Sequence, residues 1–179
     1  KKHGEFSTGD GFNSLEQLKK EDMVPILQKD HNPYVEAFWK WWPELYKSMD
    51  TFRITGGEPL LSKDTFKVLD KIIETETPNK KLKLSINSNL CVDDKLIDRL
   101  IEKASVIINE KRVKEFIIYT SVDTYGEQAE FIRTGLDFKQ LFDNIDKILE
   151  KLPKVTLVVM STFNIFSPFN YEKLVRKIY

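Results

Sequence analysis

The sequence predicts an α/β fold built on a parallel sheet, and three observations support that prediction. Four short segments rich in apolar, β-branched and aromatic residues each precede a stretch with the apolar spacing of a helix. Their centres lie about 30 to 40 residues apart, which suits β-α-β crossovers. Segments such as Phe116–Tyr119 and Val155–Val159 are almost wholly apolar, as is typical of strands buried on both faces.

The lead-in, residues 1–49, is expected to lie outside this core. Its first thirty residues are mostly polar, and they predict loops with one short helix. Asn32 followed by Pro33 predicts a helix start, because asparagine caps free amides and proline suits the first helical position. A Trp-rich helix follows, with helical spacing at Val35, Phe38, Trp39, Trp42 and Leu45.

Residues 50–179 then alternate between strands and helices. Strands are expected over residues 50–55, 81–87, 115–122 and 155–162. Helices are expected over residues 63–74, 94–104 and 138–152, and from residue 171. Ser62 and Asp93 are suitable caps for the first two of these helices.

Composition excludes several classes of protein. The 28 basic and 28 acidic residues cancel, so no basic excess for nucleic acid or an anionic membrane exists. No apolar run approaches the length of a membrane span. The single cysteine, Cys91, excludes a disulfide framework and any cysteine-rich metal site formed by these residues alone. A reducing, cytoplasmic setting is therefore expected.

Polar residues follow each predicted strand, and parallel strands end at one edge. The four segments are Thr55–Pro59, Asn87–Asn89, Ser121–Asp123 and Ser161–Asn164. Each alone is explained by the polar turn that ends an ordinary strand, and Asn87 and Asn89 can simply satisfy turn amides. Together they indicate a binding site at the carboxyl edge of the sheet.

The residue types suggest which ligand groups this edge suits. Gly56 and Gly57 let a ligand approach the backbone closely, and Glu58 can accept hydrogen bonds from an ammonium group. Ser121 and Asp123 can bind vicinal hydroxyls, and the planar fork of Arg133 can hold a carboxylate. An amino acid joined to a nucleoside, such as S-adenosylmethionine, carries all three groups.

Several motifs strengthen that interpretation. The segment Phe52–Leu61, with its Gly-Gly-Glu-Pro, resembles the corresponding segment of radical S-adenosylmethionine enzymes. Ile86–Asn89 resembles the family's Thr-Asn-Gly segment, and Ser121–Asp123 its Ser-Leu-Asp ribose segment. Ile132-Arg133 with Gly135 is similar to the stretch that supplies a carboxylate-binding arginine. The Trp-rich lead-in resembles twitch-domain members of the family.

The resemblance implies a partial (β/α)6 TIM-like barrel that binds S-adenosylmethionine and a 4Fe-4S cluster. It implies reductive cleavage to a 5′-deoxyadenosyl radical, with flavodoxin or ferredoxin as reductant and a peptide, protein or other sizeable metabolite as substrate. Carried onto this sequence, the ligand-binding residues are Gly56, Gly57, Glu58, Asn89, Ser121, Asp123 and Arg133.

The chain departs from the family in one respect. The Cys-x-x-x-Cys-x-x-Cys loop that holds the cluster is missing, and Cys91 cannot replace it. We therefore expect the cluster ligands upstream of residue 1, in a barrel core truncated at both ends. On this hypothesis the 179 residues alone are catalytically inactive.

The sequence leaves two other functions open. One is a non-catalytic module that keeps the nucleoside-binding edge or the fold for interaction with other proteins. The other is a conventional barrel enzyme of the aldolase or isomerase type, which would need Lys, His or a metal at the strand ends. Phosphate-binding glycine loops are disfavoured, because Gly9-Asp10-Gly11 lacks the third glycine and a preceding strand.

Overall fold

The computed structural model describes residues 31–179. The short helix expected within the first thirty residues lies outside this described part. The chain divides into two units, residues 1–45 and 46–179, and the sheet belongs entirely to the second unit. No helix in the described part is long and apolar enough to cross a membrane.

Helix α2, Pro33–Ser48, begins where the sequence predicts. The Asn32 Oδ1 atom accepts hydrogen bonds from the amides of Tyr34 and Val35, at 3.0 and 3.4 Å. Pro33 occupies the first helical position, where an amide would have no helical partner. The predicted cap and start of this helix are therefore confirmed.

The aromatic residues of α2 divide between buried and exposed positions. Trp42 is buried, and its ring lies 5.7 Å from that of Phe38 and 5.9 Å from that of Trp39, between ring centroids. Trp41 and Tyr34 are exposed at 57% and 79%. Phe38, Trp39 and Trp42 therefore form an aromatic cluster, whereas Trp41 and Tyr34 are largely exposed.

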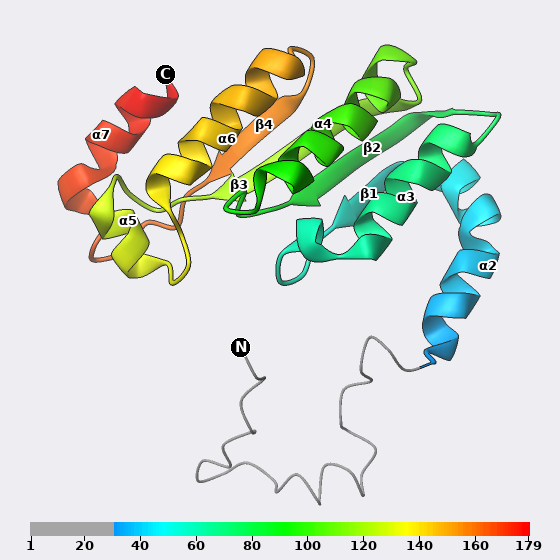
Figure 1. The fold of residues 1–179 in the computed structure, drawn as a ribbon, viewed down its shortest axis with the longest axis horizontal. Coiled ribbons are helices and arrows are strands. Elements are labelled where there is room, and N and C mark those ends of the chain that lie inside the picture. Colours follow the sequence, from blue (N-terminus) through cyan, green and yellow to red (C-terminus); the bar gives the residue numbers. More distant parts are fainter. Residues whose placement is uncertain (1–30) are drawn as a thin grey trace, which may run out of the picture. The chain divides into compact units, whose positions relative to one another are not determined.

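Four parallel strands form the sheet, in the order β1-β2-β3-β4 (Figure 1). They are β1 Thr51–Ile54, β2 Asn79–Asn87, β3 Val113–Ser121 and β4 Thr156–Met160. The helices between and after them are α3 Lys63–Glu74, α4 Asp94–Asn109, α6 Phe138–Lys151 and α7 Pro168–Ile178. The predicted α/β class and the parallel sheet are confirmed.

Side-chain caps start the three long helices of the second unit. Ser62, Asp93 and Asp137 each accept a hydrogen bond from an amide in the first turn that follows. The first two caps are those predicted. Helix α4 continues beyond the expected end at Ala104, because Ile107 is buried one turn further along the same face.

Two short elements were not predicted. The 3-10 helix η1, Pro59–Leu61, follows β1, and helix α5, Glu127–Ile132, follows β3. Helix α5 has only six residues, starts at Gly126 without a side-chain cap and buries only Ala129. Its amphipathic pattern is therefore too short to recognise, and the sequence before Arg133 is typical of a loop.

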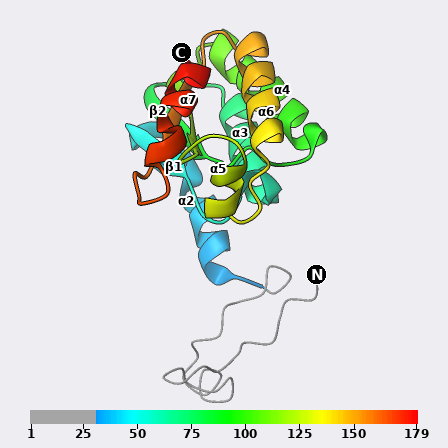
Figure 2. The ribbon, with the colours of Figure 1, turned by 90° about the vertical axis from the view of Figure 1, so that its left-hand side faces the viewer.

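The sheet has one apolar face and one mostly polar face, which corrects the expectation of strands buried on both sides. Helices α3, α4 and α6 gather on one side of the sheet (Figure 2). The apolar row Ile54, Ile86, Ile118 and Leu157 runs across all four strands in register. The alternate positions form the polar face, with side chains such as Lys83 and Glu115, which form an ion pair. In β2 the alternation of polar and apolar residues over Lys81–Asn87 is the sequence signal for this polar face, and the nearly continuous apolar runs of β3 and β4 obscure it.

Tyr46 anchors the start of the second unit, and replacing it with phenylalanine should destabilise the fold. Its side chain is 1% exposed; the hydroxyl accepts from the Asn79 amide at 3.0 Å and donates to the Arg112 carbonyl at 3.3 Å. We expect Tyr46→Phe to lower the free energy of unfolding by about 1 to 2 kcal/mol in urea titrations. Tyr34→Phe, at an exposed position, is the control and should change little. Equal stability of the two variants would contradict this role.

Candidate functional site

The carboxyl edge of the sheet brings together the four segments that the sequence singles out. Hydrogen bonds continue past the strand ends, from the Ser88 amide to the Tyr119 carbonyl at 2.9 Å and from the Val122 amide to the Met160 carbonyl at 3.1 Å. The loops that follow β2, β3 and β4 therefore leave the sheet side by side. Glu58, in the loop after β1, joins this group by contacts of its own.

Glu58 connects the loop after β1 to the loop after β2. Its Oε1 atom accepts from the Leu60 amide at 3.0 Å and from the Ser88 hydroxyl at 2.8 Å. Its Oε2 atom accepts from the Asn89 amide at 2.8 Å. The carboxylate thus caps η1 and ties down the first residues after β2.

These bonds leave Glu58 little capacity for a ligand. A carboxylate offers about four acceptor positions, and three are taken by the protein. One position remains for an outside donor, such as an ammonium group. Glu58 is therefore first a brace between two loops, which is the structural role that competes with ligand binding.

Asp123 and Arg133 form a bidentate ion pair beside β4. The Arg133 Nε and Nη2 atoms donate to the two Asp123 carboxylate oxygens at 2.7 and 3.1 Å. The Thr162 amide also donates to Asp123 Oδ1, at 2.8 Å. The Asp123 side chain is 5% exposed, whereas that of Arg133 is 36% exposed. The pair thus links the loop after β3, the end of α5 and the loop after β4.

This pairing changes what each partner can offer a ligand. The ion pair largely cancels the charge of Arg133, although about three of its five N–H groups still point elsewhere. Asp123 likewise has about one acceptor position left. The sequence assigns these two residues to separate ligand groups, and the structure joins them to each other.

Gly56 and Gly57 form the open part of the edge. Both are exposed, and a Cβ atom built on either would meet no other atom within 4 Å. Gly56 has φ +136°, a conformation that side chains rarely adopt, whereas Gly57 does not require positive φ. Space beside the backbone is therefore available at both glycines, and only Gly56 is required by the turn itself.

Asn89 and Ser121 occupy the margins of the site. Asn89 is exposed, and its Oδ1 atom accepts from the Cys91 amide at 2.9 Å, as in an ordinary turn. Ser121 is half-buried at the last position of β3. Both lie at the predicted edge: the Asn89 amide donates to Glu58, and Ser121 stands two residues before Asp123 in the chain.

Three further residues of this edge are not identified from the sequence. Ser88 and Thr162 stand out there only as parts of polar turns, and the structure makes them hydrogen-bond donors to Glu58 and Asp123. Arg53 lies on β1 and donates from Nε to Asn87 Oδ1 at 2.8 Å. Residues two positions apart in a strand lie on the same face, so Arg53 shares the face of Thr51. This alternation is the sequence signal for the position of Arg53.

No metal-binding group emerges from the described residues. Nowhere in residues 31–179 do three or more His, Cys, Asp or Glu side chains gather as a metal site would require. One cysteine cannot supply the three thiolates of a 4Fe-4S cluster open at one iron, so the donor set of this chain does not fit that cluster.

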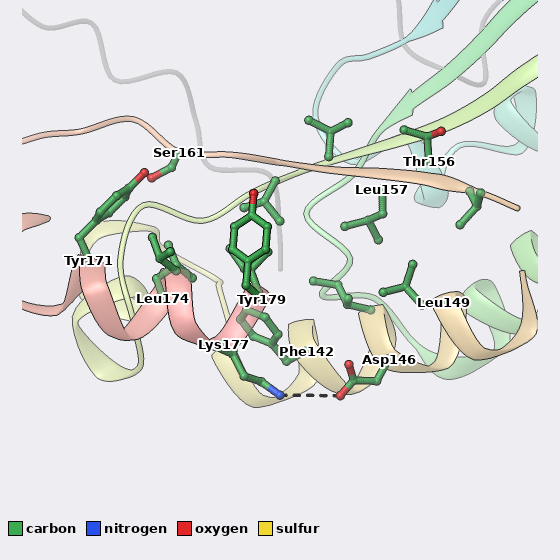
Figure 3. A pocket seen from close by; sticks show the side chains of 16 residues that line it. Phe142, Asp146, Leu149, Thr156, Leu157, Ser161, Tyr171, Leu174, Lys177 and Tyr179 are labelled. Atoms are coloured by element: carbon green, nitrogen blue, oxygen red, sulfur yellow. Dashed lines mark ion pairs between the residues drawn. The ribbon is translucent and has the colours of Figure 1, made fainter. Parts of the chain in front are cut away.

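A pocket of about 680 Å³ lies apart from the glycines, between β4, α6 and α7 (Figure 3). Apolar side chains such as Leu157 and Leu174 line most of it, and Lys177 and Asp146 form an ion pair along it at 3.9 Å. Of the predicted edge segments only Ser161 reaches it. Neither the glycines nor Glu58, Asp123 or Arg133 line this pocket.

Comparison with known proteins returns no match to any family model, curated protein or solved structure. The site therefore has to be judged on its own geometry. That geometry consists of an exposed glycine pair and two carboxylates that hold loops together. It also includes Arg133, which is paired with a carboxylate, and Arg53, which is bonded to an amide oxygen.

Replacing Glu58 with glutamine tests the brace directly. The amide keeps the shape, but its NH2 group would face a donor where the carboxylate accepts one. We expect Glu58→Gln to lower the free energy of unfolding by about 1 to 2 kcal/mol. Glu76→Gln, at an exposed residue between α3 and β2, is the matched control. Unchanged urea midpoints for both variants would rule out the brace.

Cys91 should react slowly with alkylating reagents. Desolvation by burial raises the pKa of its thiol above the ordinary 9.0; a hydrogen bond with the Asp137 backbone partly opposes this, and nearby carboxylates add to the rise. Because the folded-state pKa is the higher one, this contribution to stability is present below pH 9 and is lost as the pH rises through the folded value. Iodoacetamide labelling between pH 7 and 10 should be slower in the native chain than in urea. Equal labelling rates in the native chain and in urea would contradict the raised pKa of Cys91.

Proposed function

We propose that the carboxyl edge of the sheet binds S-adenosylmethionine. The observation that carries the proposal is the exposed Gly56-Gly57 backbone beside the carboxylate of Glu58, since a Cβ atom placed on either glycine would have no neighbour within 4 Å. A ligand can approach this backbone closely and place an ammonium group near the one acceptor position that Glu58 retains.

The remaining predicted residues have supporting roles in this proposal. Ser121 and the free acceptor position of Asp123 would bind ribose hydroxyls, and Asn89 would supply a side-chain amide at the margin. Arg133 would meet the ligand carboxylate with its outward N–H groups while Nε and one Nη2 hydrogen stay on Asp123. The ion pair makes this contribution smaller than that of a free arginine.

The wider proposal is that the sheet is part of a (β/α)6 barrel of the radical S-adenosylmethionine type. The polar face opposite α3, α4 and α6 supports it, because a barrel interior that holds ligands is polar where the ligand lies. When bound, a 4Fe-4S cluster supplies the electron that cleaves this ligand. The single cysteine does not hold such a cluster, so the proposal for this chain is confined to ligand binding and positioning.

A second candidate is a binding module that holds the same ligand without cleaving it. The cysteine count favours it for these 179 residues, since binding needs no iron. The two candidates make the same prediction for affinity. They differ in whether 5′-deoxyadenosine is released after anaerobic supply of iron, sulfide and reductant.

Substitution of Gly57 gives the sharpest test of binding. Gly57→Ala should leave the fold unchanged or slightly stabilised, because the added Cβ meets nothing and the backbone needs no positive φ. We expect the wild-type chain to bind S-adenosylmethionine saturably in isothermal titration calorimetry. Gly57→Ala should weaken this binding about tenfold, and Gly57→Val more.

Thermal midpoints of the variants provide the control for folding. If the wild-type chain binds no S-adenosylmethionine, the proposed function fails. If both Gly57 variants bind as well as the wild-type chain, the ligand does not lie against this backbone and the assignment of the glycines is wrong.

A further inference from the structure

Arg53 lies across the polar face of the sheet in a fixed position. Its Nε atom donates to Asn87 Oδ1 on β2 at 2.8 Å, and its guanidinium carbon lies 4.4 Å from the centre of the Tyr119 ring on β3. Its Nη2 atom reaches within 3.9 Å of the Met160 sulfur on β4. One side chain from β1 thus contacts all three other strands close to their carboxyl ends.

The charge of Arg53 is not matched by a carboxylate in the described part of the chain. Three other arginines form ion pairs, Arg112 with Glu110, Arg133 with Asp123 and Arg176 with Glu172. The partners of Arg53 are instead an amide oxygen, an aromatic ring and a thioether, none of which carries a charge. Nη1 has no hydrogen-bond acceptor among residues 31–179.

Arg99 also stacks on an aromatic ring without an ion pair in the described part, and it serves as a comparison for Arg53. Its guanidinium lies 4.1 Å from the centre of the Phe66 ring, and like Arg53 it is exposed and has no ion pair in the described part. It lies on α4, in the helical layer, and no side-chain acceptor within residues 31–179 orients its Nε atom. Arg53 differs in being oriented by Asn87 and in lying beside the loops of the candidate site.

We propose that Arg53 binds a carboxylate of a molecule lying on the polar face of the sheet. Stacking on Tyr119 and the bond to Asn87 hold the guanidinium in place, so its Nη edge can bind an anion with little further loss of side-chain freedom. A carboxylate matches the single positive charge. A phosphate carries up to two negative charges and would leave one unmatched, because the nearby Lys83 is paired with Glu115.

The carboxylate has two sources, and this inference rests in part on the proposed function. One source is the methionine part of S-adenosylmethionine, in which case Arg53 takes the role that the sequence assigns to Arg133. The other is a second, acidic molecule that would be the substrate, such as a peptide with a glutamate side chain. The same variants distinguish the two sources when matched probes are used.

The test measures binding to the whole 179-residue chain carrying Arg53→Gln or Arg53→Lys, with Arg99→Gln as the control. The probes are S-adenosylmethionine, its decarboxylated analogue, and the blocked peptides acetyl-Glu-Gly-amide and acetyl-Gln-Gly-amide. The Arg53 Nε–H resonance is followed by 15N NMR during each titration. We expect one carboxylate probe to shift this resonance and to bind Arg53→Gln at least about tenfold more weakly.

The carboxylate-free counterpart of that probe should bind the wild-type chain and Arg53→Gln equally. Arg53→Lys, which keeps the charge but loses the planar fork, should recover only part of the affinity. Arg99→Gln should bind every probe as the wild-type chain does.

The outcomes separate this inference from the proposed function. If S-adenosylmethionine binds but no carboxylate probe depends on Arg53, the inference is overturned and the proposed function stands. If the acidic peptide depends on Arg53 while S-adenosylmethionine does not bind at all, the inference holds and the proposed function fails. A shift of the Arg53 resonance that is equal for Glu and Gln peptides would also overturn it.

Discussion

Two carboxylates hold the loops at the carboxyl edge of the sheet, and the geometry of the candidate site depends on them. Glu58 joins the loop after β1 to that after β2, and Asp123 joins the loops after β3 and β4 with the help of Arg133. Loop amides that no longer bond to a neighbouring strand need an acceptor from a side chain or from water. The acidic side chains supply acceptors to such amides at Leu60, Asn89 and Thr162.

The same arrangement decides which groups remain free for a ligand. Acceptor positions on Glu58 and Asp123 are mostly occupied by the protein, whereas the backbone at Gly57 and the guanidinium of Arg53 face open space or uncharged neighbours. Binding would therefore rely on close approach to the backbone and on one oriented cation. Carboxylates that also brace loops can add to binding, but their loss would disturb the fold at the same time.

Most of the fold could be predicted because its signals are local. Ser62 and Asp93 are capping residues directly before their helices. Helices α3, α4 and α6 are long enough for the repeat of their apolar residues to be recognised. Helix α5 was missed because six residues carry too little periodicity. The polar face of the sheet was missed because the nearly continuous apolar runs of β3 and β4 outweighed the alternation of polar and apolar residues over Lys81–Asn87 in β2.

For this protein the sequence by itself determined the class of fold, the caps of its main helices and the edge at which polar residues gather, since propensity, periodicity and parallel connection are properties of short segments. Only the tertiary structure decided the pairing of those residues. Arg133 stands ten residues from Asp123, and Arg53 lies two strands away from Tyr119, yet one guanidinium is neutralised and the other is not. Charge pairing depends on distances in space, which no local pattern records.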